Sequence, residues 1–249
     1  AQVQAMETAD VAVLSAAQAQ ALSTGQVAAL STSQVQAMST AGISGLTTDA
    51  VKGLSNSQLQ AITTAGVAAL TTTQVGALGT AQVAALTSTE TAALTTTQVQ
   101  ALSTAQVKAL EVGDLAAMST AQVAALTTAQ VGTLDTAQVK AITTSAVAAM
   151  TTAQVSSLTT DQVAALTTAQ VNVLTSTQVQ ALSTSQVAAL TTSQVKDLAS
   201  TTVAALSSNQ VNALGTAQVA ALSKSVISAL TTGQVAGLNT TVLKALTTD

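Results

Sequence analysis

The chain has 249 residues, of which 48% are hydrophobic and only 6% are charged, and its formal net charge is −4. It contains no His, Cys, Pro, Trp, Tyr or Phe, and its basic residues are six lysines. A weakly acidic chain without a basic cluster lacks the charge pattern of a nucleic-acid-binding protein. Without His, Cys, Tyr or Arg, and without a convergent acidic cluster, the usual acids, bases and metal ligands are missing, so we expect no enzyme, catalytic residue, metal site or cofactor.

A leucine-type residue recurs every eight residues, from Leu14 to Leu246, thirty times without an insertion. Residues 7–246 therefore divide into thirty octads with the consensus Thr-Thr-Ala-Gln-Val-Ala-Ala-Leu, numbered here as positions 1 to 8. A period held this strictly predicts one small structural unit stacked on copies of itself. We interpret 1–249 as a single continuous array with partial octads at both ends. Because no polar capping repeat closes it, we expect a segment of a longer array, or copies that join end to end.

Each octad carries the signals of a helix start. Position 1 is Ser or Thr in 23 octads and position 4 is Gln in 20, which is the spacing of a capping box. Position 8 of the preceding octad is Leu in 25 octads and position 5 is Val in 23, so a hydrophobic staple coincides with the box. Positions 2 to 7 then form a short helix. Position 7 is Ala in 22 octads, which indicates close packing, and the variable positions 3 and 6 indicate the solvent face.

The octads predict an all-α solenoid, a superhelix of thirty short capped helices. One continuous helix is excluded, since eight residues advance an apolar face by roughly 80° at about 100° per residue. A β-solenoid is the alternative, because Val and Thr favour strands. Alanine at two positions and few turn residues argue against it. The handedness and the number of octads per turn do not follow from the sequence. Apolar stretches of about four residues are too short for a membrane span.

Some octads depart from the consensus. Glu7 and Asp10 place carboxylates at positions 1 and 4, as do Glu111 and Asp114. A Ca²⁺ site needs six to eight oxygens, so we interpret both pairs as caps of helix N-termini. Four glycines occur early in the array: Gly42, Gly45, Gly53 and Gly66. They either make this part of the array less stable or indicate places where two backbones approach closely.

Two later departures contain lysine. Lys196 and Asp197 are adjacent in sequence, so they do not face one another on a helix. Ser223, Lys224 and Ser225 bring a hydroxyl and an amine together, but an active serine needs a desolvated lysine in a pocket. We expect Lys224 to be solvated.

The unit Leu-Thr-Thr-Ala-Gln-Val-Ala-Ala-Leu, present with variation at 126–134 and most clearly at 158–190, resembles octad arrays in very large bacterial surface or secreted proteins. The resemblance covers essentially the whole chain. It implies an extracellular or cell-surface scaffold or adhesin stalk, and it brings no catalytic residues.

We therefore expect a structural protein, a rod, stalk or filament subunit that self-associates head to tail through its terminal repeats. The alternative is a binding module that presents a regular Thr/Ser lattice to ice or to a polysaccharide. That alternative is weakened because positions 1 and 2 are committed to capping.

Overall fold

The computed structural model describes residues 3–246, which fold into short helices. These helices form two compact units, which comprise residues 3–126 and 127–246 of the described chain. The first unit contains η1 (Val3–Ala5), α1 (Thr8–Ala12), α2 (Ala16–Gln20), α3 (Thr24–Ala28), α4 (Thr32–Ala37), α5 (Thr40–Gly45), α6 (Thr48–Lys52), α7 (Asn56–Leu59), α8 (Thr64–Ala69), α9 (Thr72–Ala77), α10 (Thr80–Ala84), α11 (Ser88–Ala93), α12 (Thr96–Ala101), α13 (Thr104–Ala109), α14 (Val112–Ala117) and α15 (Thr120–Ala125).

The second unit continues the same pattern. It contains α16 (Thr128–Thr133), α17 (Thr136–Ala141), α18 (Thr144–Ala149), α19 (Thr152–Ser156), α20 (Thr160–Ala165), α21 (Thr168–Asn172), α22 (Ser176–Ala181), α23 (Thr184–Ala188), α24 (Thr192–Lys196), α25 (Ser200–Ala205), α26 (Ser208–Asn212), α27 (Thr216–Ala220), α28 (Lys224–Ile227), α29 (Thr232–Ala236) and α30 (Thr240–Leu246). Residues 3–246 contain no strand, so the all-α solenoid is confirmed and the β-solenoid alternative was wrong. None of these helices is long and apolar enough to cross a bilayer.

The corners between helices need no special residue. In the octad of α12, the N-cap Thr95 has φ −73° and ψ 160°, and the residue after the helix, Leu102, has φ −62° and ψ 136°. Both conformations are extended and open to any residue. Across residues 3–246 no residue has a positive φ. Position 8 and the following position 1 therefore turn the chain by themselves, which explains why so few glycines are sufficient.

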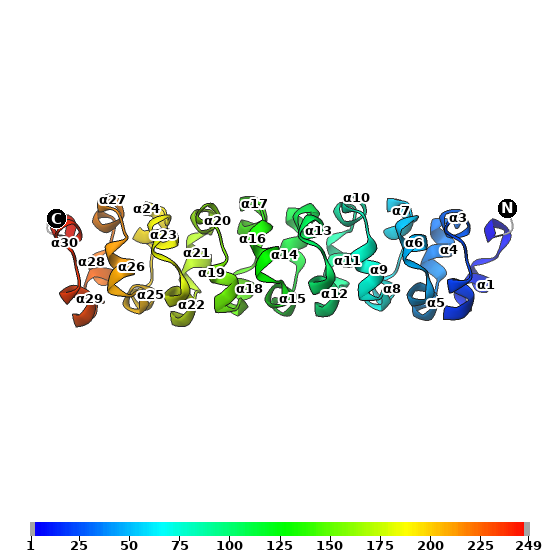
Figure 1. Ribbon diagram of the computed structural model, residues 1–249, viewed down its shortest axis with the longest axis horizontal. Coiled ribbons are helices and arrows are strands. Elements are labelled where there is room, and N and C mark those ends of the chain that lie inside the picture. The colour runs from blue at the N-terminus through cyan, green and yellow to red at the C-terminus, as the bar shows by residue number, and fades with distance from the viewer. Residues whose placement is uncertain (1–2, 247–249) are drawn as a thin grey trace. The chain divides into compact units, whose positions relative to one another are not determined.

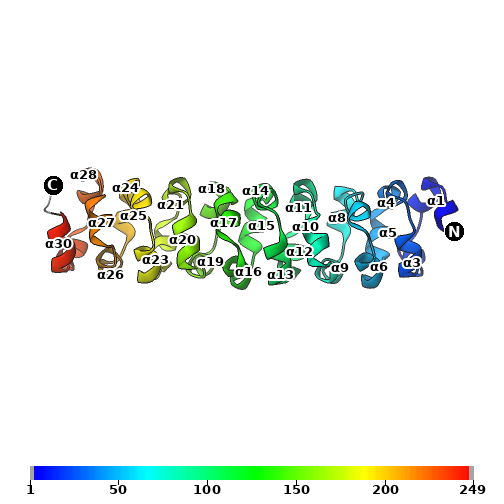
Figure 2. The same ribbon diagram turned by 90° about the horizontal axis from the view of Figure 1, so that it is seen from above.

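Within each unit the helices wind into a coil. Each helix packs on the helix three further along, as α5 does on α8 and α22 on α25 (Figures 1 and 2). The hydrogen bonds that the glutamines at position 4 make to the preceding coil span 28 to 31 residues, for example from Gln98 to Leu70 and Val67. Three octads are 24 residues and four are 32. One turn of the coil therefore takes between three and four octads, which the sequence alone did not give.

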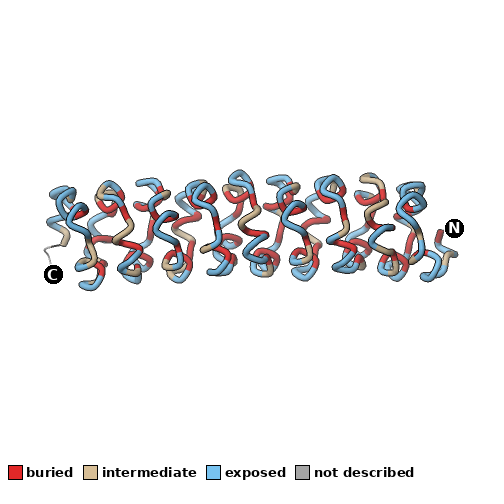
Figure 3. The backbone as a smooth tube through the Cα atoms, turned by 90° about the horizontal axis from the view of Figure 1, so that it is seen from below, coloured by how far each residue is buried: buried red, intermediate tan, exposed pale blue. Residues whose placement is uncertain are grey.

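The core lies on the inner side of the coil, and the outer bends are exposed (Figure 3). Positions 5 and 8 are buried in most octads, as Val99 and Leu102 illustrate, whereas Val235 and Leu243 at position 5 are about half exposed. Position 6 is exposed at Lys52, Lys108 and Lys140, which confirms the predicted solvent face. Position 4 is also buried in most octads, and Gln98 is only 1% exposed. The sequence analysis did not predict an amide in the core, and the partners of this amide define the candidate site.

Position 7 packs against the outer start of a helix on the preceding coil. A Cβ added at Gly45 would lie 2.4 Å from the carbonyl oxygen of Ala16 and 2.5 Å from its Cα. A Cβ at Gly53 would lie 2.6 Å from Cγ2 of Thr24, a flexible side chain. Of the two explanations offered for the early glycines, close backbone approach holds at Gly45.

Replacing Gly45 by alanine is expected to destabilise the first unit by about 1–3 kcal/mol, because the new methyl group meets backbone that has little room to move. This is expected even though alanine is the usual residue at position 7. The matched control is Gly25→Ala in α3, where a Cβ meets nothing within 4 Å. That change should stabilise by about 0.4–1 kcal/mol. Urea unfolding followed by circular dichroism measures both, and equal effects would contradict the close approach.

Candidate functional site

The most developed polar feature of the chain is the glutamine at position 4, which caps its own helix. In α12, the side-chain Oε1 of Gln98 accepts a hydrogen bond from the backbone N–H of Thr95 at 2.6 Å. The hydroxyl of Thr95 accepts from the backbone N–H of Gln98 at 3.2 Å. This is the predicted capping box, and it satisfies two of the donors that a helix start leaves without partners.

The amide nitrogen of the same glutamine caps a second helix. Nε2 of Gln98 donates to the carbonyl oxygens of Val67 at 2.9 Å and Leu70 at 2.6 Å, at the end of α8 on the preceding coil. These acceptors belong to the last turn and corner of α8, where the carbonyl of Val67 also accepts from the N–H of Leu70 at 3.2 Å and the carbonyl of Leu70 lies beyond the helix. One side chain therefore joins the start of α12 to the end of α8.

This double cap recurs throughout both units. Within 3–126 the same carbonyl register is used by Gln34, Gln58, Gln74, Gln82, Gln98, Gln106 and Gln122. Within 127–246 it is used by Gln162, Gln170, Gln178, Gln186, Gln194, Gln210, Gln218 and Gln234.

Asparagine at position 6 makes a further bond between coils that the sequence reasoning missed. Asn172 donates from Nδ2 to the carbonyl of Asp197 at 2.7 Å, and its Oδ1 accepts from the N–H of Ala199 at 2.9 Å. Asn212 repeats both bonds with Gly237 and Asn239. The available signal was the amide side chain at position 6. We had predicted that this position faces only solvent.

In the two acidic pairs only the aspartate caps the helix, which is half of the predicted arrangement. A carboxylate oxygen of Asp10 accepts from the N–H of Glu7 at 3.1 Å, and one of Asp114 accepts from the N–H of Glu111 at 2.9 Å. Neither Glu7 nor Glu111 caps through its own side chain. Only half of each box is therefore formed, by the residue at position 4.

A third acidic residue lies in the core near Asp114, and the sequence reasoning missed it. In the octad of α11, Glu90 stands at position 4 and Thr91 at position 5, where Gln and Val are usual. Oε2 of Glu90 accepts from the N–H and the hydroxyl of Thr87 at 2.7 and 2.8 Å. Glu90 is 4% exposed and Thr91 0%, and the other glutamate oxygen and the Thr91 hydroxyl have no hydrogen-bond partner. The available signal was two adjacent departures from the consensus, at positions 4 and 5 of one octad.

The helix α14 brings Asp114 to this place, since α11 packs on α14. Asp114 is 2% exposed. Burial raises the pKa of Asp114 above its ordinary value of 3.8, and the charges of Glu111 and Glu90 add to the rise. The hydrogen bond from Glu111 and the nearby hydroxyl of Thr91 act in the opposite direction. We call Glu90, Thr91 and Asp114 the acidic joint.

The lysine departures lie at the surface. Lys224 is exposed, as predicted, and the hydroxyls of Ser223 and Ser225 lie 2.9 Å from each other. Lys196 and Asp197 are both exposed.

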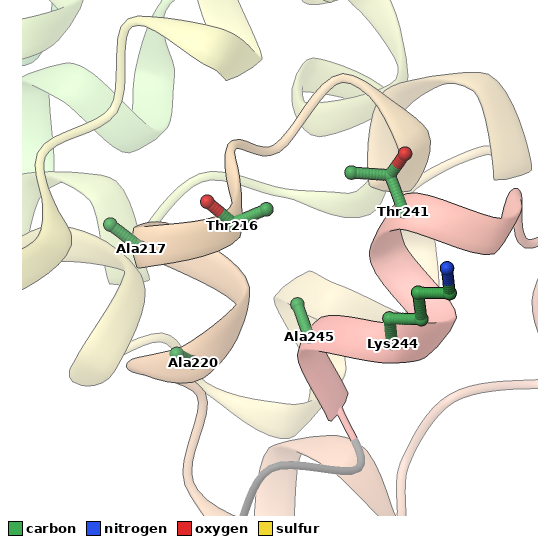
Figure 4. A pocket seen from close by; sticks show the side chains of 6 residues that line it. All are labelled: Thr216, Ala217, Ala220, Thr241, Lys244 and Ala245. Atoms are coloured by element: carbon green, nitrogen blue, oxygen red, sulfur yellow. The ribbon is translucent and has the colours of Figure 1, made fainter.

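A groove of about 560 Å³ lies between α27 and α30 (Figure 4). Its walls are small side chains and one lysine: Thr216, Ala217, Ala220, Thr241, Lys244 and Ala245. No pair of residues in this lining has the acid and base character that catalysis needs.

The ALTTAQ repeat model matches the chain over most of its length, at residues 3–40, 54–88, 107–144, 134–168, 163–192 and 187–224. The chain belongs to the ALTTAQ repeat family. The six letters correspond to positions 7, 8, 1, 2, 3 and 4 of the octad, as in residues 165–170. The ALTTAQ sequence thus runs through the corner and ends on the glutamine that makes the double cap. A comparison with curated proteins gives no match.

Proposed function

We propose that this tandem-repeat protein is an extended structural spacer, a rod, stalk or filament subunit outside a bacterial cell, and that it has no enzymatic activity. The observation that carries the proposal is the double cap. Because the same bonds join each coil to the next, an added octad adds the same length and the same interface wherever it is placed. Such an array sets a distance between whatever lies at its two ends.

The surface supports this role. The outward positions are mainly Thr, Ser, Ala and Gln, and the whole chain carries six lysines against ten acidic residues. A surface with few charges and no large single-sign field attracts neither nucleic acid nor anionic lipid. The extracellular location is proposed from the resemblance to octad arrays of bacterial surface and secreted proteins.

Head-to-tail association is part of the proposal. At position 4, Gln18 and Gln26 are exposed, whereas Gln34 and the later position-4 glutamines of the first unit are buried. Their amides are placed like those that cap an earlier coil, so carbonyl groups of a second copy would complete the same bonds. An interface between unlike ends does not close into a ring and can continue into a filament.

Electron microscopy of the purified chain over a concentration series tests the proposal. Filaments that lengthen with concentration would support a polymer-forming subunit, and elongated particles of one fixed length would support a spacer. Compact, rounded particles at every concentration would contradict both. A chain shortened by three octads serves as a control, since particle length should fall in proportion to octad number.

A regular hydroxyl lattice remains the second candidate. Positions 1 to 3 are exposed, as at Thr95, Thr96 and Thr97, so hydroxyls do reach the surface in octad register. The hydroxyl at position 1 already accepts a capping bond, which leaves position 2 and part of position 3 for a ligand. Thermal hysteresis and glycan pull-down measure ice and polysaccharide binding, and null results in both would exclude this candidate.

A further inference from the structure

The acidic joint contains a carboxyl group where the other octads have an amide donor. Oε2 of Glu90 makes the bonds to Thr87 that Oε1 of a glutamine makes elsewhere. Carboxyl and carboxamide groups have the same planar shape, so Oε1 of Glu90 takes the place of the glutamine nitrogen. That oxygen is buried and has no partner.

The register of the coil shows what this oxygen faces. The neighbouring glutamine Gln98 donates to carbonyls 31, 30 and 28 residues earlier, at distances between 2.6 and 3.4 Å. Gln82, one octad before Glu90, uses the same three positions at 2.9 to 3.3 Å. The equivalent carbonyls for Glu90 are those of Leu59, Gln60 and Ile62. Three acceptors therefore converge on a fourth oxygen.

A proton fits this arrangement better than a metal ion. An O–H···O bond spans about 2.5–3.0 Å between oxygens, which matches the register. A calcium ion needs six to eight oxygen ligands, whereas the register supplies one carboxylate oxygen and three carbonyl oxygens. An ionised Glu90 leaves one oxygen without a donor in a buried place, which costs free energy.

The surrounding charges also favour proton uptake. α11 packs on α8 and α14. α8 carries no titratable side chain, and neither does α7 with the corner that follows it, 56–62, whose carbonyls face Glu90 in this register. α11 carries Glu90, and α14 contributes Asp114 together with Glu111 at its cap. Every titratable group that these helices bring to the joint is thus acidic. The charge of Glu90 is one of the causes that raise the pKa of Asp114, so the two carboxyl groups act on one another.

We propose that the acidic joint takes up a proton from solvent in the folded chain, and that the contact between α11 and α14 is therefore tightest in mildly acidic solution. The proposal is independent of the spacer function. Its sign follows from proton linkage. A raised pKa at Asp114 means that the folded state binds more protons than the unfolded state above pH 3.8. This stabilisation is complete below that value and is lost as the pH rises through the raised pKa.

Hydrogen exchange followed by mass spectrometry tests the proposal on the intact chain. Protection factors, corrected for the chemical exchange rate, are measured from about pH 7 down to about pH 4.5 in the octads 87–94 and 111–118. The regular octads 71–78 and 95–102 provide an internal reference. Protection of the joint relative to the reference is expected to rise on acidification, by up to about tenfold for a proton held one pH unit more tightly.

The variant E90Q/D114N removes both carboxyl groups and should abolish this rise. The control variant E7Q/D10N removes an exposed pair and should retain it. If the double variant loses helicity, the single variant E90Q is used instead. It supplies the amide found in the other octads, and it should reduce the rise in protection on acidification. The proposal is overturned if relative protection does not change with pH or if the rise persists in E90Q/D114N. It is also overturned if Ca²⁺ at neutral pH, rather than acid, produces the protection.

Discussion

Replacing Gln98 by leucine is expected to destabilise the first unit by about 3–5 kcal/mol. The change removes the donor to the carbonyls of Val67 and Leu70 and the acceptor for the N–H of Thr95. Each buried group left without a partner costs about 1–3 kcal/mol, and the gain from a larger apolar side chain offsets part of the loss. Urea unfolding and the exchange rate of the Thr95 amide measure the effect.

The matched control is Gln100→Leu in the same helix. Gln100 is at position 6 and is exposed, so the same substitution is expected to change stability by less than about 0.5 kcal/mol. If Gln98→Leu and Gln100→Leu behave alike, the double cap does not stabilise the coil.

Replacing Leu102 by serine is the second change with a large expected effect. Leu102 is 4% exposed, and truncation of a buried leucine costs about 2–5 kcal/mol even before a hydroxyl is buried. Since α12 packs on α9 and α15, the loss should appear first as faster hydrogen exchange in these three helices. Thermal unfolding and local exchange are the measurements.

Here the control is Gln100→Ser, which places the same residue on the exposed side of α12. Equal helicity and equal melting of Leu102→Ser and Gln100→Ser would show that position 8 does not face the core.

The local structure of each octad was predictable because its signals lie within eight residues. The capping box joins positions 1 and 4, and positions 5 and 8 lie on one side of a helical turn. The structure therefore confirms the helix starts, the buried Val and Leu and the exposed lysines.

The winding of the coil was not predictable, because it depends on partners 28 to 31 residues apart. Oε1 of Gln98 has a local partner, and the capping box accounts for it. Nε2 has no hydrogen-bond partner within its octad, and the sequence spacing does not predict which carbonyl accepts from it. A buried donor must nevertheless be satisfied, so the unassigned half of the amide was the clue to contact between coils.

The acidic joint was missed for a related reason. Glu111 and Asp114 stood out because both departures fall at cap positions of one octad. The sequence pattern predicts only a capping role for Glu90, since Ser/Thr-x-x-Glu is a normal capping box. Its significance emerges only when the winding places α11 beside α14 and leaves one carboxyl oxygen facing carbonyls.

The spacing of the double caps also has a consequence for how the chain folds. The bond from Gln98 to Val67 spans 31 residues, so a segment shorter than about four octads cannot close one. A helix of six residues is unstable alone, and the first closed coil is therefore the nucleus. Because every contact is short compared with the chain, the contact order is low and folding is fast for a chain of this length. Any four neighbouring octads that retain the consensus can form that nucleus, and the folded region then grows from it in both directions.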